Sequence, residues 1–174
     1  MSVKSRQLLA AVTCLSSVAA GAHSASDAYL TLTADAASPA HALIHGQWDI
    51  ALRDLDFVLQ LDDHGDGRVT WGEVSRHRAA IERYVYAHLR VDAGAGNPCA
   101  IKPVRLMVDA HADGAYAALF FDVACANMPA RLDLGYNLFF AIDPSHRGIL
   151  VMHHAGEIAT SVLSAKNAAV GLVL

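Results

Sequence analysis

The sequence predicts an α+β fold: an antiparallel β-sandwich-like domain of about seven strands with one inserted helix–loop–helix unit. Apolar residues recur at helical spacing over residues 50–89, on both sides of a polar loop. Before and after this unit apolar and polar residues alternate, which is typical of half-buried strands. Short connections after Pro98 favour antiparallel pairing. A chain of 174 residues is long enough for one domain with its own core.

Two strands are expected ahead of the helical unit. The first covers residues 28–33, and the second covers residues 41–50, where Trp48 and Ile50 share one face. One helix is then expected over residues 50–61 and another over residues 71–89. His77 and Arg78 interrupt the apolar face of this second helix.

The chain after the helical unit is predicted to be all strand and turn. Residues 93–98, Ala-Gly-Ala-Gly-Asn-Pro, make a clear break. Strands over residues 104–108 and 119–125 follow, joined by a hairpin turn at Asp113-Gly114. The remaining strands are expected at residues 132–142, 149–153 and 158–163.

Residues 1–24 predict a secretory signal peptide. Lys4 and Arg6 precede an apolar stretch, and Ala22-His23-Ser24 places small residues ahead of a cut before Ala25. A cut directly after Ala22 is a second option, and an uncleaved anchor is disfavoured because the apolar run is short and contains Ser and Thr. We therefore expect a single domain, residues 25–174, in a bacterial periplasm or secreted.

Two cysteines remain after the predicted cut, Cys99 and Cys125. An even pair in an oxidising compartment predicts a disulfide, and two buried free thiols are the alternative. The midpoint between them is residue 112, beside the expected hairpin turn, so the hairpin should bring them together. A bulge would shift this register by a few residues.

The loop at residues 62–73, Asp-Asp-His-Gly-Asp-Gly-Arg-Val-Thr-Trp-Gly-Glu, has the spacing of an EF-hand calcium loop. Acidic residues fall at positions one, five and twelve, and Gly67 falls at position six, where the chain must turn sharply. Calcium is a hard cation that prefers oxygen ligands. The expected ligands are the carboxylates of Asp62 and Asp66, the backbone carbonyl of Arg68, Thr70 directly or through a water, and both oxygens of Glu73.

His64 departs from the EF-hand pattern at position three, where Asp or Asn is usual. An imidazole is a poor calcium ligand, so we include His64 in the candidate site as a place that a water can take. With three ligand carboxylates we expect weak binding, at roughly 10⁻⁴–10⁻³ M. The competing interpretation is that residues 70–73 form only a capping box for the second helix. The two interpretations are compatible, and a cap alone does not require Asp62, Asp66 and Gly67 at these distances.

Several runs of the sequence carry a family resemblance. Residues 46–56, 71–74 and 143–148, together with the loop, resemble the exported N-terminal region of HupE/UreJ-type bacterial membrane proteins. The resemblance implies a membrane transport protein for nickel or cobalt as a partner. Residues 168–174 are apolar but far shorter than the roughly 20 residues of a membrane helix. We therefore expect either a shortened chain or a detached soluble module.

The predicted function is that of an exported, non-enzymatic calcium-binding domain with a structural or interaction role. The alternative is a periplasmic module for Ni²⁺, Co²⁺ or Zn²⁺ that works with a HupE/UreJ-like transporter, since imidazoles suit these metals. Its candidate ligands are His41 and His45 on one strand face and the adjacent pair His153 and His154.

Other classes of function find little support in the sequence. A net charge of −4 without a basic run argues against nucleic acid as a partner. No catalytic motif has a supporting context, and His146 and Arg147 at a predicted turn are the first residues to consider if activity appears. Residues 109–114 repeat the spacing of Asp, His and Gly at the start of the calcium loop. Position twelve would be Phe120, which cannot bind a cation, so a hairpin turn is the better interpretation.

Overall fold

The computed structural model describes residues 26–34, 42–94, 96–127 and 129–174. The predicted signal peptide and His41 lie outside the described residues. Within them, strands predominate and the helices are short. The elements are β1 (Asp27–Ala34), β2 (Ala42–Ala51), α1 (Leu52–Leu59), α2 (Trp71–Arg76), α3 (Arg78–Tyr86), β3 (Leu89–Asp92), β4 (Ala100–His111), β5 (Gly114–Cys125), β6 (Arg131–Tyr136), β7 (Arg147–His154), β8 (Glu157–Leu163) and β9 (Ala169–Val173).

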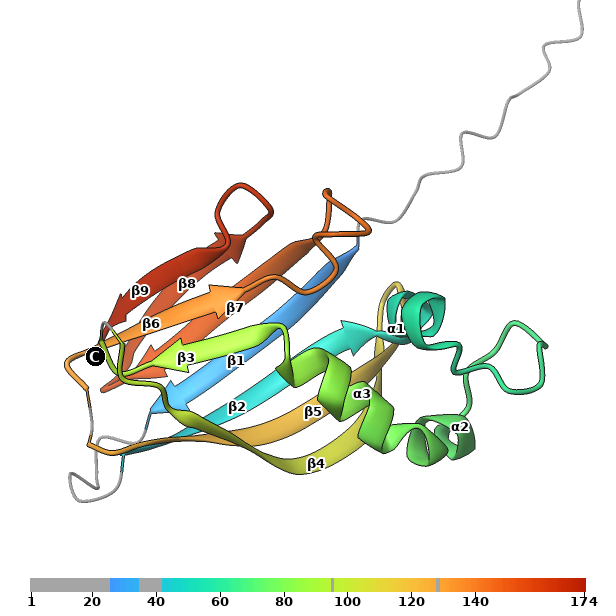
Figure 1. Cartoon of the computed structure of the whole chain (residues 1–174), viewed down its shortest axis with the longest axis horizontal. Helices are drawn as coiled ribbons and strands as arrows, with labels where there is room; N and C mark the ends of the chain where they lie inside the picture. Colours follow the sequence, from blue (N-terminus) through green and yellow to red (C-terminus); the bar gives the residue numbers. More distant parts are fainter. Residues whose placement is uncertain (1–25, 35–41, 95, 128) are drawn as a thin grey trace, which may run out of the picture.

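The strands form two sheets rather than a closed barrel. The larger sheet has six strands in the order β4-β5-β2-β1-β7-β8, and the smaller has three in the order β3-β6-β9. In Figure 1 the smaller sheet lies in front of the larger one, and α3 continues this front layer toward β4 and β5. The fold is therefore a β-rich α+β fold, as predicted, with nine strands among the described residues instead of about seven.

The core lies between these layers. The ring of Trp48 on β2 packs against the ring of Tyr136 on β6, with centroids 5.4 Å apart. Gly148 on β7 permits the approach of Tyr136, because a Cβ there would lie 2.8 Å from that ring. Ile81 and Val85 of α3 are fully buried in the same cluster.

The antiparallel expectation is wrong at one pair of strands. β1 pairs antiparallel with β2 on one side but parallel with β7 on the other, with Asp27 opposite Arg147. Parallel neighbours need a long crossover, and here most of the domain lies between the two strands. This pairing places the start of β1 beside the turn that precedes β7.

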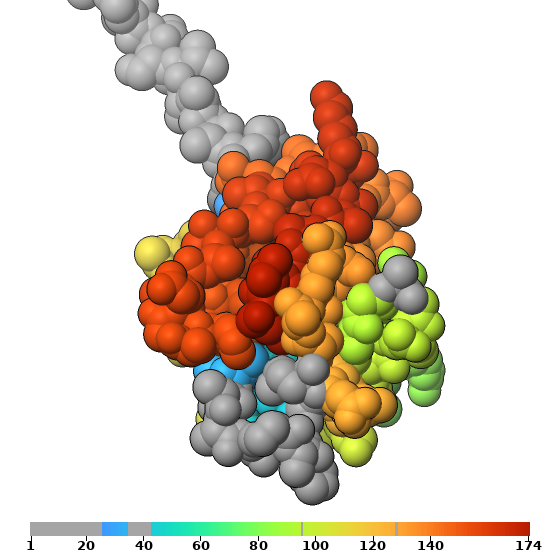
Figure 2. All heavy atoms as spheres, turned by 90° about the vertical axis from the view of Figure 1, so that its left-hand side faces the viewer, coloured from blue at the N-terminus to red at the C-terminus, as the bar shows by residue number. Residues whose placement is uncertain are grey.

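The strand predictions omit two strands and extend a third too far. The four-residue β3 and the C-terminal β9 were not predicted, and the predicted strand 132–142 ends at Tyr136. Phe139 has a φ of 59°, and the chain turns over residues 138–142 although every residue there is apolar. The apolar tail is β9, which pairs with β6 and lies between β6 and β8 in Figure 2.

The β4–β5 hairpin confirms the predicted disulfide. Cys99 and Cys125 are bonded, with Cα atoms 4.4 Å apart. The register shifts by one residue at a bulge between Pro103 and Arg105, and this shift sets Cys99 opposite Cys125. The turn itself is one residue earlier than predicted, because His111 pairs with Gly114.

The disulfide indicates an oxidising compartment. No helix within the described ranges is long and apolar enough to cross a membrane.

Candidate functional site

The candidate loop leaves the first helix through a cap that the sequence analysis missed. α1 begins at Leu52, after Ile50 and Ala51 have completed β2, and it ends at Leu59 with Gln60 in the left-handed region. Asp56 Oδ1 then accepts hydrogen bonds from the backbone N–H groups of Leu61 at 2.7 Å and of Asp62 at 2.9 Å. The exit from the helix is thus fixed by a carboxylate six residues ahead of loop position one.

Asp62 organises the first half of the loop. Its Oδ1 accepts from the N–H groups of His64, Gly65 and Asp66 at 3.2, 2.8 and 3.3 Å, and its Oδ2 accepts from Gly67 at 2.7 Å. The bond from Gly67, followed by those from the other N–H groups, lowers the pKa of Asp62 below its usual value. Gly67 has a φ of 79°, which only glycine adopts without strain.

Glu73 closes the second half of the loop. Thr70 is the N-cap of α2, and its N–H and hydroxyl both donate to Glu73 Oε2 at 2.7 Å. The Glu73 N–H donates back to the Thr70 hydroxyl, so the predicted capping box is present. Glu73 is only 1% exposed, although it carries a charge. The bonds from Thr70, with a further bond from His64, lower the pKa of Glu73 to about 2.

His64 lies against the carboxylate of Glu73. Its Nδ1 is 2.7 Å from Glu73 Oε1, while 69% of the imidazole side chain is exposed. The contact with Glu73 raises the pKa of His64, which favours the protonated ring. Position three is therefore linked to position twelve by a direct side-chain contact.

Asp63, at position two, is the second residue that the sequence analysis missed. Its carboxylate accepts from Arg76 at 2.7 Å and contacts His77 Nε2 at 2.7 Å. The bond to His77 and then that to Arg76 lower the pKa of Asp63. The predicted second helix is broken at this point into α2 and α3, because His77 adopts a non-helical ψ of 4° while it contacts the loop. The sequence contains a sign of this break, because His77 and Arg78 interrupt the apolar face of the predicted helix.

The six predicted site residues fall into two groups. His64, Thr70 and Glu73 are in direct contact, and Asp62 is linked to them through the neighbouring backbone. Asp66 Oδ1 instead accepts from the Arg68 N–H at 2.9 Å. No group of three or more His, Cys, Asp or Glu side chains in the described part of the chain has the arrangement of a metal site. The donor chemistry nonetheless fits a hard cation, because three carboxylates, a hydroxyl and a carbonyl share one loop with the required glycine turn.

The histidines of the alternative metal module are dispersed. His45 Nδ1 is 2.8 Å from Asp122 on the neighbouring strand. His153 and His154 are successive residues of β7, so their side chains point to opposite faces of the sheet. His41 lies outside the described residues. Among the described residues, His45, His153 and His154 therefore do not combine into one imidazole cluster.

A second polar cluster lies where β1 begins. Ser26 donates to Asp54 Oδ2 at 2.9 Å and contacts the buried His146 Nδ1 at 2.7 Å, and His146 Nε2 is 2.7 Å from the Tyr136 hydroxyl. Burial lowers the pKa of His146, despite the neighbouring carboxylates of Asp54, Asp143 and Asp27. With a neutral ring every bond is satisfied when Tyr136 donates to Nε2 and Nδ1–H donates to Ser26.

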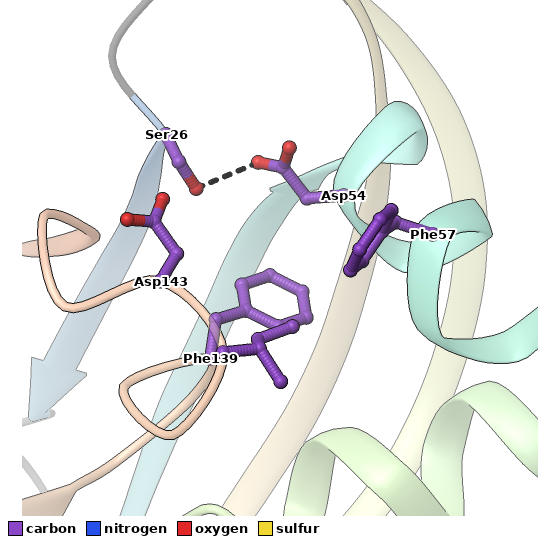
Figure 3. A pocket seen from close by; sticks show the side chains of 6 residues that line it. Ser26, Asp54, Phe57, Phe139 and Asp143 are labelled. Atoms are coloured by element: carbon purple, nitrogen blue, oxygen red, sulfur yellow. Dashed lines mark hydrogen bonds between the residues drawn. The ribbon is translucent and has the colours of Figure 1, made fainter.

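This chain of bonds borders a small hollow. The hollow has a volume of about 240 Å³ and is lined by Ser26, Asp54, Asp143 and three apolar residues. Figure 3 shows the Ser26–Asp54 bond at its wall. The Ser26 hydroxyl is committed to Asp54, and the His146 ring is bonded at both nitrogens. Arg147 is bonded to Asp27 at 2.7 Å. These contacts give His146 and Arg147 roles in holding the fold together.

Comparison with protein-family models and with curated proteins finds no match for this chain. The resemblance to HupE/UreJ-type proteins therefore stays a prediction. Function has to be argued from the geometry of the two clusters, and the loop at residues 62–73 offers the more specific chemistry.

Proposed function

We propose that this protein is an exported, non-enzymatic domain whose loop at residues 62–73 binds one calcium ion. Asp62, Asp66 and Glu73 supply carboxylate oxygens, Arg68 its carbonyl, and Thr70 a hydroxyl or a bound water. His64 does not ligate and gives up its contact with Glu73 when the ion binds. The predicted signal peptide and the disulfide together support a periplasmic or secreted location.

The observation that carries the proposal is the hydrogen-bonded framework of the loop. A buried Glu73 and an Asp62 that accepts four backbone N–H groups hold the chain in a turned conformation, with Gly65 and Gly67 at positive φ. A capping box alone needs only Thr70 and Glu73. The added carboxylates at positions one and five are what a cation site requires, and they concentrate negative charge that a divalent ion would neutralise.

The physical effect of the ion is to stabilise the junction between α1 and α2. An ion that binds only the folded chain adds about 2.7 kcal/mol to the free energy of unfolding at a hundredfold excess over its Kd. Val69, beside the ligands, packs against the core, so order in the loop extends to the helices. This supports a structural or interaction role; a membrane transport protein is the partner that the sequence resemblance suggests.

The test is calorimetric titration of the chelator-stripped protein with Ca²⁺, repeated for Glu73→Gln. We expect saturable one-to-one binding with a Kd of roughly 10⁻⁴–10⁻³ M in the natural chain and none in the variant. Glutamine is also favoured at this position of a capping box, so the helix start is retained. Glu82→Gln on α3 is the matched control, since Glu82 pairs with Arg78 outside the loop. Failure of the natural chain to bind millimolar Ca²⁺, or full binding by Glu73→Gln, would refute the proposal.

A further inference from the structure

The β4 strand forms an open edge of the larger sheet. All of its residues except Val104, which lies in the bulge, pair with β5 on one side, and no strand in the described parts of the chain pairs with the other side. Only Leu106 is buried, whereas Val104, Met107 and Val108 are 57%, 43% and 36% exposed. Open edges present unpaired backbone groups that can accept another strand. Pro103 and the bulge protect the first part of β4, but the stretch from Arg105 to Asp109 has neither device.

The hairpin determines which backbone groups face the open edge. His111 and Gly114 flank a two-residue turn and so form a hydrogen-bonded pair. Bonded and non-bonded pairs alternate, hence Arg105, Met107 and Asp109 direct their backbone groups toward β5. Leu106 and Val108 direct theirs outward. The Ala110 N–H agrees with this pattern, because it donates to the carboxylate of Asp109 at 2.8 Å rather than to β5.

The open stretch is complementary to itself. If two copies pair antiparallel about Met107, then Arg105 of each copy stands opposite Asp109 of the other, which makes two ion pairs of opposite charge. Leu106 then stands opposite Val108 on the other face, and these are the residues with free backbone groups. Directly opposed charges of opposite sign stabilise a strand pair, and like charges destabilise it. Centring the pair on Arg105 or on Asp109 would oppose like charges, so charge favours the register about Met107.

An exposed aromatic ring borders the same stretch. Trp71, the first residue of α2, is 54% exposed and lines a hollow of about 490 Å³ together with the four residues from Arg105 to Val108. An apolar wall beside an open edge gives an incoming strand side-chain contacts in addition to backbone hydrogen bonds. Trp71 directly follows Thr70, so this wall is held by the loop and its capping box.

We propose that β4 is a dimerisation edge on which a second copy of this chain pairs antiparallel about Met107, joining two six-stranded sheets into one. The occupant is a copy of the same chain because the charge pattern complements itself. The inference is independent of calcium binding, and its test is done in chelator.

The first experiment is sedimentation of the purified protein and of two charge reversals. We expect a concentration-dependent dimer in the natural chain, and dimerisation at least about tenfold weaker in Arg105→Asp and in Asp109→Arg, since each variant opposes like charges twice. An equimolar mixture of the two variants should dimerise again, as should the double variant Arg105→Asp/Asp109→Arg. Lys166→Glu, in the turn between β8 and β9, is the control and should behave as the natural chain.

The second experiment fixes the register and does not alter the charges. Met107→Cys should form a covalent dimer on mild oxidation, because Cα atoms of a non-bonded pair lie about 4.5 Å apart, within disulfide range. Val108→Cys is the matched control. In the proposed register the Val108 residues of the two copies are offset along the strands by about 7 Å, so cysteines there should not cross-link. The proposal is overturned by a natural chain that stays monomeric up to about 1 mM, by dimers insensitive to both charge reversals, or by equal cross-linking of the two cysteine variants.

Discussion

His64 is the one residue of the loop whose side chain conflicts with the calcium pattern. It contacts Glu73 Oε1 at 2.7 Å, and Glu73 Oε2 is already held by Thr70. Both oxygens of the position-twelve carboxylate are therefore engaged by groups of the loop itself. A cation that binds Glu73 has to replace the imidazole contact, which is a physical reason for weak affinity in addition to the smaller number of carboxylates.

Replacement of His64 tests this reasoning. His64→Asp should tighten calcium binding by about tenfold or more, because it removes the competing contact and adds a fourth ligand carboxylate. His64→Asn, which supplies a neutral oxygen, should fall between the natural chain and His64→Asp. Calorimetric titration of all three proteins measures the order. If the three affinities are equal, then position three does not face the ion, and the proposed coordination is wrong.

At the scale of elements, the bulge in β4 decides where the disulfide forms. Beyond the bulge, Ala110 pairs with Ala115, but before it Ala100 pairs with Ala124. Without the one-residue shift at Val104, Cys99 would stand opposite Ala126 instead of Cys125. The symmetric spacing of the two cysteines about residue 112 was sufficient to predict the bond. The position of the bulge that aligns them was not predictable, since it depends on packing against β5.

Removal of this bond has a predictable cost. The cysteines are 26 residues apart, and the chain-entropy model gives about 3–4 kcal/mol for closing such a loop in the unfolded chain. The double variant Cys99→Ser/Cys125→Ser should lose about this much free energy of unfolding in urea titrations. The natural chain under reducing conditions is the control and should show a similar loss. A loss well under about 1 kcal/mol would mean that the hairpin keeps the unfolded chain compact without the bond.

The other elements show which signals in the sequence were sufficient. Regular alternation of apolar and polar residues predicted β1, β2, β7 and β8 with small errors at their ends. The prediction from alternation was wrong after Tyr136. The chain turns at Phe139, and the positive φ of that residue cannot be predicted from the spacing of apolar residues. β3 is too short to establish a period, and β9 (Ala-Val-Gly-Leu-Val) has no polar residues that could alternate with the apolar ones.

At the scale of the whole molecule, the features that could not be predicted from the sequence are those that depend on contacts between distant segments. The parallel pairing of β1 with β7 joins residues about 120 positions apart, and no local pattern specifies it. The same pairing brings Ser26 to His146 and so builds the buried chain of bonds through Tyr136. This cluster ties the start of β1, the first helix and the smaller sheet together. The six proposed ligand residues of the loop, in contrast, lie within twelve positions, and spacing alone was enough to propose them.

The buried His146 makes the stability of the whole domain depend on pH in a defined direction. Burial lowers the pKa of His146 in the folded protein, while an unfolded histidine titrates near 6.5. Between these two values the unfolded chain binds more protons than the folded one, so stability falls as pH drops below about 6.5 and is unaffected by this group above it. His146→Gln removes the titrating group and disturbs the bonds to Ser26 and Tyr136. It should lower the free energy of unfolding by about 1–3 kcal/mol at neutral pH.

The measurement that separates these effects is urea unfolding at several pH values between about 5 and 7.5, across the ordinary pKa of histidine. His146→Gln should be less stable than the natural chain at neutral pH but should lose less stability on acidification. His153→Gln on β7 is the matched control, because it removes a histidine from the same strand region without touching the buried bonds. If the natural chain and His146→Gln lose the same free energy of unfolding on acidification, then another group causes that loss. The buried imidazole of His146 would then not be the source of the pH dependence.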